Sequence, residues 1–286
     1  MDLLVIGGGF TGAAVARLAV ARGMAVHATT RSDERAAKLR AIGVVPIVAP
    51  HLDASALAAC VDDETSVLVT VPPEPGTDGD APIAAAIWLA GARAITYVSS
   101  TGVYGDASGR VDEDTRVDRR APRAAARLDA EAAWRSAGAS VVRAPAIYGP
   151  GRGLHLRLAR REVRGVSTGA NAISRVHVDD LAAALFALLE SRSRGQVFVM
   201  GDLEPSPNAE VVRWICDALA IAPPPFEPVE AVDETLRHDR RADSARIRGE
   251  LGLALAYPTY REGYAHCIAA DRDAIDAATS YARPSM

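Results

Sequence analysis

A glycine-rich turn between a short apolar run and an alanine-rich segment is the feature that most constrains how this chain can fold. Residues 3–6 are all apolar, and the motif G-x-G-x-x-G follows directly at residues 7–12. Residues 13–22 have the composition of a helix, and residues 25–29 that of a second strand. This order of strand, glycine turn, helix and strand predicts a βαβ unit that binds a dinucleotide.

The three glycines of this motif have distinct predicted roles. Gly7 permits a sharp turn, Gly9 leaves room for a pyrophosphate to approach the backbone, and Gly12 lets the helix pack closely on the strand. The free N–H groups at the start of the helix would then face an anion. Phe10 and Thr11, between the second and third glycines, are expected to belong to the same binding site.

Alternation of apolar runs and helical patterns predicts the fold class. After the first unit, strands are expected at residues 44–48, 66–71, 94–99, 139–143, 174–178 and 196–200, and helices at 33–42, 53–60, 81–90, 122–137, 154–164, 179–191, 205–220, 242–251 and 258–273. Such alternation is typical of an α/β protein with a doubly wound parallel sheet. We expect a dinucleotide-binding domain over residues 1–150 and a smaller lobe over 151–286, from which residues 174–202 return to the sheet.

Composition argues against several other classes of protein. The net charge is −4, and no basic cluster is flanked by aromatic residues, so no nucleic-acid partner is expected. The apolar runs are shorter than a membrane span and the chain starts directly with a strand, so we expect no membrane association, no signal peptide and a cytoplasmic location. The three cysteines are far apart and the six histidines lack ligand spacing, so no disulfide and no metal site are predicted.

Five later segments resemble motifs of one family, in the order in which that family has them. Tyr97–Gly105 resembles the fifth-strand motif of the extended short-chain dehydrogenases, the NAD-dependent epimerase/dehydratase family. Arg143–Gly151 is similar to its R-x-x-x-x-Y-G-P-G motif, and Arg175–Leu181 to its H-V-x-D segment. Val197–Asp202 and Tyr257–Gly263 also resemble family segments. This resemblance, over residues 2 to 265, implies a Rossmann fold with an interleaved C-terminal substrate lobe.

The resemblance also implies a catalytic centre that departs from the family pattern. Ser100 would hydrogen-bond a substrate oxygen. The acid–base tyrosine of the family, and the lysine four residues later that lowers its pKa, fall at Arg123 and Arg127. Lys38 is the only lysine of the chain, and no tyrosine lies four residues before it, so the usual dyad is absent. The chain therefore resembles the atypical members of the family.

Other side chains are candidates for the missing roles. Tyr104 and Tyr148 follow strands that border the predicted cleft, and either phenol could reach a substrate oxygen. Arg123 could hold a substrate carboxylate or phosphate, and Arg127 a ribose or phosphate. His177 is expected to support the cleft. Two acidic residues at a helix start, Asp179 and Asp180, are expected to cap that helix.

The residues after the second strand indicate which coenzyme is bound. An acid at this place would bind both ribose hydroxyls, but the chain has Arg31, which can pair with a 2′-phosphate while Ser32 donates a hydroxyl. NADP is therefore the preferred coenzyme, and Asp33 keeps NAD as an alternative. Further coenzyme-binding positions are expected at Val71, Pro72, Ser99 and Pro145.

Two functions from different classes stay open. The first is an NAD(P)-dependent oxidoreductase or epimerase-like enzyme with a non-standard active site, acting on a small-molecule substrate that an arginine would hold by an anionic group. The second is a non-catalytic NADP-binding sensor or scaffold. The absent dyad favours the sensor, whereas Ser100 and the Y-G-P-G segment favour the enzyme. The helices expected at 81–90 and 122–137 are candidates for a homodimer interface.

Overall fold

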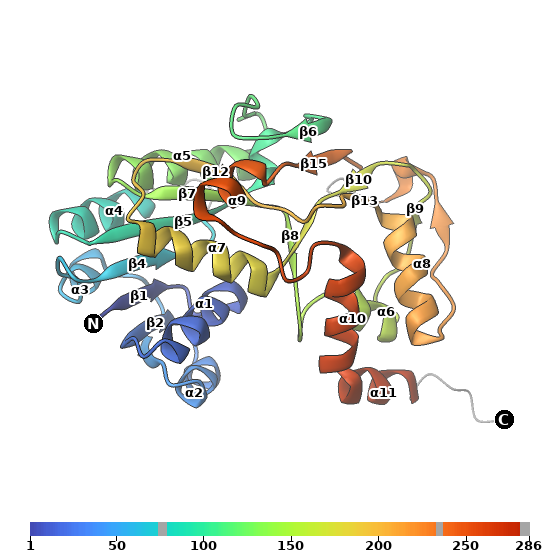
Figure 1. Ribbon diagram of the computed structural model, residues 1–286, viewed down its shortest axis with the longest axis horizontal. Coiled ribbons are helices and arrows are strands. Elements are labelled where there is room, and N and C mark those ends of the chain that lie inside the picture. Colours follow the sequence, from blue (N-terminus) through green and yellow to red (C-terminus); the bar gives the residue numbers. More distant parts are fainter. Residues whose placement is uncertain (74–78, 233–236, 281–286) are drawn as a thin grey trace.

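A seven-stranded parallel sheet forms the centre of the protein, and the first glycine turn lies at its middle. The structure, a computed structural model, describes residues 1–73, 79–232 and 237–280. The strand order is β12-β7-β5-β4-β1-β2-β3 (Figure 1). The strands are β1 (Leu3–Ile6), β2 (Val26–Thr30), β3 (Val45–Val48), β4 (Ser66–Val69), β5 (Ala94–Ser100), β7 (Ser140–Ala144) and β12 (Val197–Val199). The order reverses between β1 and β4, and open α/β sheets bind ligands at such a switch point.

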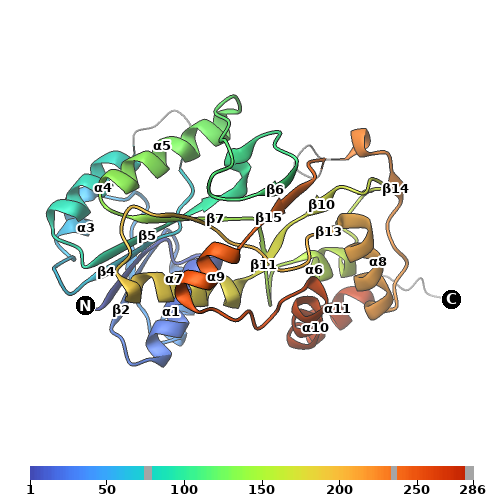
Figure 2. The same ribbon diagram turned by 45° about the horizontal axis from the view of Figure 1, so that its top comes forward.

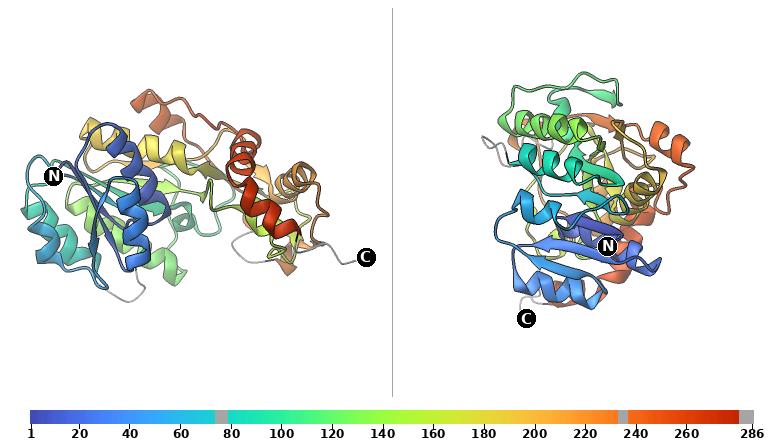
Figure 3. Two further views of the ribbon diagram at one scale, coloured as in Figure 1. Left: turned by 90° about the horizontal axis from the view of Figure 1, so that it is seen from below. Right: turned by 90° about the vertical axis from the view of Figure 1, so that its left-hand side faces the viewer.

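Helices cover both faces of this sheet, which confirms the predicted doubly wound fold. On one face, Leu3 and Val5 pack against α1 (Phe10–Ala21), α2 (Asp33–Ala41) and α7 (Val178–Ser191). The helices α3 (Ala54–Ala58), α4 (Asp80–Leu89) and α5 (Pro122–Ser136) cover the other face (Figure 3). Leu4 and Ile6 pack against them. Successive strand side chains point to opposite faces, so a strand covered on both sides is apolar throughout.

A second apolar core lies beside the sheet, in the C-terminal part of the chain. It joins α6 (Leu154–Ala159), α8 (Asn208–Leu219), α10 (Tyr260–Ala270) and α11 (Arg272–Ser280). The single helix predicted at 258–273 is therefore wrong in its extent: α10 ends at Ala270, Asp271 is its C-cap residue, and α11 begins at Arg272. The remaining helix α9 (Ala245–Leu251) contacts α7.

Short strands link this part to the rest of the chain. A four-stranded sheet has the order β13-β10-β15-β6, and two strand pairs are β11 with β8 and β14 with β9. These strands are β6 (Gly109–Val111), β8 (Ala146–Tyr148), β9 (Val166–Ser167), β10 (Ala172–Ile173), β11 (Arg175–His177), β13 (Ser206–Pro207), β14 (Phe226–Glu227) and β15 (Arg240–Ala242). Strand β6 lies beside β15 although about 130 residues separate them (Figure 2). No helix in the described ranges is both long enough and apolar enough to cross a membrane.

Candidate functional site

The glycine turn after β1 is a tightly constrained piece of backbone. Gly7 has a φ of +106°, and a Cβ there would lie 2.7 Å from Thr70 Oγ1. A Cβ at Gly12 would lie 2.1 Å from the carbonyl oxygen of Gly7, so only glycine allows α1 to start this close to β1. A Cβ at Gly9 would meet no atom closer than 3.9 Å. The space beside Gly9 is therefore open to a ligand.

Hydrogen bonds hold this turn in place, and the backbone N–H groups at the start of α1 are not capped by a described side chain. The N–H of Gly7 donates to Thr29 Oγ1 at 2.8 Å, and the Thr70 hydroxyl donates to the Gly7 carbonyl at 2.6 Å. Gly9 is the N-cap residue of α1, no side chain caps the helix, and its first turn holds no acid. The uncapped N–H groups and the helix dipole together favour an anion at this point.

Cationic side chains surround the glycine turn. Arg31 is exposed just after β2, and the Ser32 hydroxyl caps α2 by accepting from the N–H of Arg35 at 3.4 Å. The guanidinium of Arg35 approaches within 3.9 Å of the place of a Cβ on Gly9. Arg152 lies over the ring of Phe10, with its guanidinium carbon 5.2 Å from the ring centroid.

Arg35 and Arg152 are further candidates for coenzyme binding, which the sequence alone did not indicate. The side chain of neither forms an ion pair in the part of the chain that the structure describes, and both are exposed. A weak signal existed for Arg35, since it lies one helical turn after Arg31. No local pattern pointed to Arg152, because only the fold brings it to Phe10.

The other predicted coenzyme positions follow the carboxyl ends of neighbouring strands. Val71 and Pro72 come after β4, and Pro145 comes after β7. Parallel strands end at the same edge of a sheet, so these residues share an edge with the glycine turn. The side chain of Ser99 faces the core, where its buried hydroxyl donates to Glu131 at 2.5 Å, and the coenzyme contact of this residue stays a prediction.

Ser100 lies at the adjoining end of β5, and the two arginines that the sequence analysis predicts at the dyad positions lie on α5. Ser100 is the last residue of β5 and is half-buried, and its hydroxyl accepts from the N–H of Gly102 at 3.1 Å. Arg127 of α5 donates to the hydroxyl of Tyr97 at 3.1 Å and therefore points towards β5. Arg123, one turn earlier, is exposed and forms no ion pair with the described residues.

Tyr104 and Tyr148, the two tyrosines offered as candidates for the missing catalytic tyrosine, are both buried. Tyr104 donates its hydroxyl to the Asp112 carbonyl at 2.6 Å, and burial raises its pKa. Tyr148 stacks on Tyr264 with 4.4 Å between the ring centroids, and a Cβ on Gly263 would meet its hydroxyl. Burial also raises the pKa of Tyr148. Both rings turn into the core, so neither phenol is available to a substrate.

A buried ion pair lies directly beneath the end of β5. Arg143 of β7 donates to Glu131 of α5 through Nε at 3.1 Å and through Nη2 at 2.8 Å, and both side chains are almost completely buried. Its remaining Nη1 donates to the Tyr104 hydroxyl at 3.2 Å. Together with Ser99, these groups join two strands, α5 and the turn after Ser100 into one hydrogen-bonded unit.

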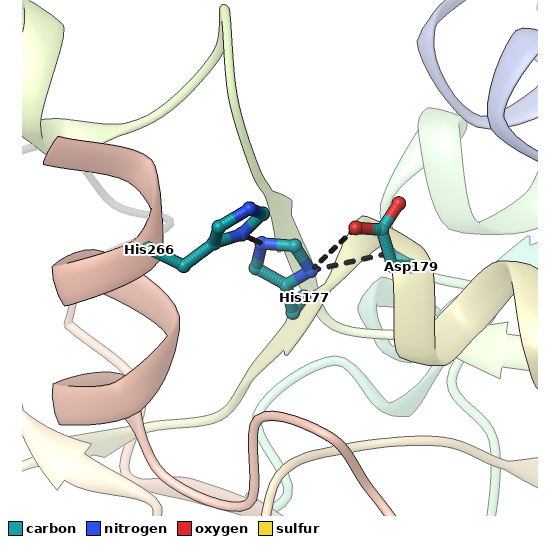
Figure 4. A group of neighbouring side chains, drawn as sticks. All are labelled: His177, Asp179 and His266. Atoms are coloured by element: carbon teal, nitrogen blue, oxygen red, sulfur yellow. Dashed lines mark hydrogen bonds and ion pairs between the residues drawn. The ribbon is translucent and has the colours of Figure 1, made fainter. Parts of the chain in front are cut away.

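His177, at the end of β11, forms a cluster with Asp179 and His266 (Figure 4). The N–H of Asp179 donates to His177 Nδ1 at 3.2 Å, so the His177 ring is the cap of α7. This bond places the proton of the neutral ring on Nε2, which lies 3.3 Å from His266 Nδ1 and donates to it. Burial lowers the pKa of His177 to about 4, which keeps the ring neutral near pH 7. The arrangement is therefore that of a hydrogen-bonded helix cap.

Both aspartates lie in the first turn of α7, as predicted, but the side chain that caps the helix is that of His177. Asp179 instead forms an exposed ion pair with Arg17 of α1 at 3.1 Å. Asp180 is buried and accepts from the N–H groups of Ala256 at 2.7 Å and Tyr257 at 3.0 Å. It thereby fixes the chain that leads into α10.

Comparisons with known proteins show the family to which the chain belongs. Residues 7–192 match the model of the NAD(P)H-binding family. The chain is 30% identical over 210 residues to a 3-diazoavenalumate denitrifying reductase from a Streptomyces species, an alignment that covers 65% of this chain and 69% of that protein.

Solved structures extend the similarity over nearly the whole chain. A conserved protein of unknown function from Silicibacter pomeroyi DSS is 30% identical, with a TM-score of 0.82 and coverage of 93% of this chain and 98% of that one. A candidate NAD-dependent epimerase/dehydratase from Methylobacillus flagellatus is 26% identical, with a TM-score of 0.75 and coverage of 95% and 98%. The chain therefore belongs to the NAD(P)H-binding family, among Rossmann-fold proteins of the NAD-dependent epimerase/dehydratase type.

Proposed function

We propose that the protein is an NADP-dependent reductase that delivers a hydride to a small anionic substrate. The observation that carries this proposal is the open glycine turn, surrounded by uncompensated arginines, at the same sheet edge as the half-buried Ser100. The bound nicotinamide supplies the hydride. Ser100 orients a substrate oxygen or nitrogen, and the exposed guanidinium of Arg123 binds an anionic group of the substrate.

The proposed chemistry does not need a tyrosine as acid. Arginine, which stays protonated and donates protons poorly, occupies both dyad positions, and the two nearby tyrosines face the core. A substrate whose reduction needs no proton from an enzyme phenol fits this site best. The similar Streptomyces reductase, by its name, reduces a diazo carboxylate with loss of nitrogen. Diazo carboxylates therefore belong in the substrate panel, next to carbonyl compounds and nucleotide sugars.

Consumption of NADPH with this panel tests the function, and Ser100→Ala tests the site. We expect turnover to fall about 100-fold in Ser100→Ala, because one transition-state hydrogen bond is lost, while NADPH affinity stays unchanged. Ser136→Ala, on the exposed side of α5, is the matched control and should be as active as wild type. Wild-type turnover in Ser100→Ala would remove Ser100 from the mechanism.

A non-catalytic NADP sensor is the second candidate. The observation that favours it is the pair Arg123 and Arg127 at the dyad positions. Tight NADPH binding without consumption across the whole panel would assign this function instead.

We further propose that the coenzyme preference comes from Arg31 and Arg35. Both side chains are exposed and free of ion pairs with described residues, and a 2′-phosphate between them would gain two charge-assisted hydrogen bonds. Arg31→Gln and Arg35→Gln should each weaken NADPH binding roughly 10- to 100-fold and leave NADH binding unchanged. Arg40→Gln, at the other end of α2, is the control. Equal losses for both coenzymes would contradict the assignment to the 2′-phosphate.

A second copy of the chain is the proposed partner of α4. This helix packs against α5 and exposes Trp88 and Leu89 to 54% and 76%. Two large apolar side chains together on an outer helix suit a two-fold interface. Sedimentation of wild type and of Trp88→Asp tests this proposal, with a dimer expected only for wild type.

A further inference from the structure

The turn of residues 149–152 places the guanidinium of Arg152 near the first residue of α1. Gly149 and Arg152 exchange two backbone hydrogen bonds of 2.9 and 3.0 Å, which fix the turn. A Cβ on Gly149 would lie 3.2 Å from Phe10 Cζ, and the guanidinium of Arg152 lies over the same ring. Phe10 is the first residue of α1. The turn thus brings Arg152 next to the uncapped N–H groups of this helix.

The positive charge of Arg152 has no carboxylate partner among the described residues. The side chain is exposed, and no carboxylate of the described residues forms an ion pair with it, whereas Arg17 pairs with Asp179 and Arg261 with Glu204. The cation–π contact of an exposed guanidinium such as that of Arg152 is weak, so the guanidinium can leave the Phe10 ring for an anion. The positive end of α1 offers the place for that anion.

The C-terminal helices anchor the opposite side of this turn. The N–H of Gly151 donates to Asp271 Oδ2 at 2.6 Å, and His155 Nε2 lies 2.7 Å from the same oxygen. His155 is completely buried, and burial lowers its pKa, so the neutral ring donates its Nε2 proton to the carboxylate. Asp271 lies between α10 and α11. The position of the turn is therefore set by the C-terminal part of the chain.

We propose that Arg152 binds the pyrophosphate of the coenzyme and that Asp271 is its positioning residue. This inference rests on the proposed coenzyme-dependent function and adds a binding residue to the same site. The guanidinium can pair with one phosphate through two parallel N–H donors while the N–H groups of α1 bind the other side of the anion. Coenzyme binding then links the central sheet to α10 and α11.

Binding measurements on the full chain test the role of Arg152. We expect Arg152→Gln to weaken NADPH and NADH binding equally, by roughly tenfold or more, since both coenzymes carry the pyrophosphate. This equal loss distinguishes Arg152 from a residue that binds the 2′-phosphate. Arg157→Gln, an exposed arginine of α6, is the matched control and should bind both coenzymes like wild type. Unchanged coenzyme affinity in Arg152→Gln would overturn the inference.

A nucleotide sugar also carries a diphosphate, so UDP-glucose serves as a second probe. Weaker binding of UDP-glucose in Arg152→Gln, with coenzyme affinity intact, would assign the arginine to a substrate diphosphate and overturn the proposal. Failure of the wild-type protein to bind either coenzyme would overturn the proposed function as well. If the wild-type protein binds the coenzymes and Arg152→Gln binds them equally well, only the role of Arg152 is contradicted and the proposed function stands.

A double-mutant cycle tests the positioning role of Asp271. Asp271→Ala should weaken coenzyme binding severalfold in the wild-type background and have no further effect together with Arg152→Gln. Asp271→Asn keeps an oxygen that accepts from Gly151 and His155, so it should restore most of the affinity. Melting temperatures of all variants report folding. Additive losses in the cycle would show that Asp271 acts only through general stability and would overturn its assigned role.

Discussion

Replacing Gly12 with alanine will abolish coenzyme binding and destabilise the protein, whereas replacing Gly9 with alanine will abolish binding alone. At Gly12 the new Cβ would lie 2.1 Å from the Gly7 carbonyl oxygen, so α1 must move away from β1. We expect a loss of about 1–3 kcal/mol in the free energy of unfolding, as for an overpacked core. The donors of the first turn of α1 move with the helix, so the anion site is lost.

Gly9→Ala is the matched control for this effect. Gly9 has a φ of −78° and an open surrounding, so alanine fits its backbone and should leave the stability unchanged or raise it by up to about 1 kcal/mol. Its methyl group would occupy the space that the pyrophosphate needs. Denaturant unfolding and NADPH titration of both variants are the measurements. Wild-type NADPH affinity in Gly9→Ala would mean that the coenzyme does not approach the turn at this residue.

Replacing Glu131 with alanine will lower the free energy of unfolding by about 3–5 kcal/mol, the usual result of leaving one buried charge without its partner. Arg143 loses its two hydrogen bonds to the carboxylate, and the Ser99 hydroxyl loses its acceptor. Neither group can turn to solvent, because the side chains of Arg143 and Ser99 are both buried. Chemical denaturation followed by circular dichroism measures the loss.

Two further variants separate charge burial from other effects. Asp129→Ala, on the same helix as Glu131, removes an exposed ion pair with Arg119, which precedes the helix, and it should change the stability very little. Glu131→Leu combined with Arg143→Met replaces the pair with apolar side chains, and it should recover most of the stability that Glu131→Ala loses. A small loss in Glu131→Ala, similar to that in Asp129→Ala, would contradict the role of the buried pair.

The central sheet could be predicted because its determinants are local. Leu3–Ile6 and residues 67–69 are buried on both faces of the sheet, so both stretches are apolar without interruption, and Leu3–Ile6 is followed directly by the glycine turn and a helical pattern. The short strands of the second part have no such pattern. Gly109–Val111 becomes a strand because Arg240–Ala242 lies beside it. Two or three residues are too few for periodicity to be recognised.

In the candidate site, too, only the part that local sequence determines could be predicted. The glycine turn depends on spacing within one βαβ unit, and the sequence displays that spacing directly. The direction of a side chain at a strand end depends on what packs around it. Tyr148 is the last residue of β8, just after β7, at the expected edge of the sheet. Its ring nevertheless lies in the core, because it stacks on Tyr264 of the distant helix α10. Arg152 could not be recognised for the same reason, since its partner Phe10 is 142 residues away.

The pairing of β6 with β15 has a consequence for how the chain folds during synthesis. A nascent chain that ends near residue 150 already contains six strands of the central sheet, but β7 is then an open edge because β12 has not been made. Strand β6 stays unpaired for longer, because its partner β15 is available only after residues 240–242 have left the ribosome. Unpaired edges are sites of aggregation, and distant pairings form slowly. Fragments that keep the glycine turn but stop before residue 199 should therefore precipitate or require chaperones.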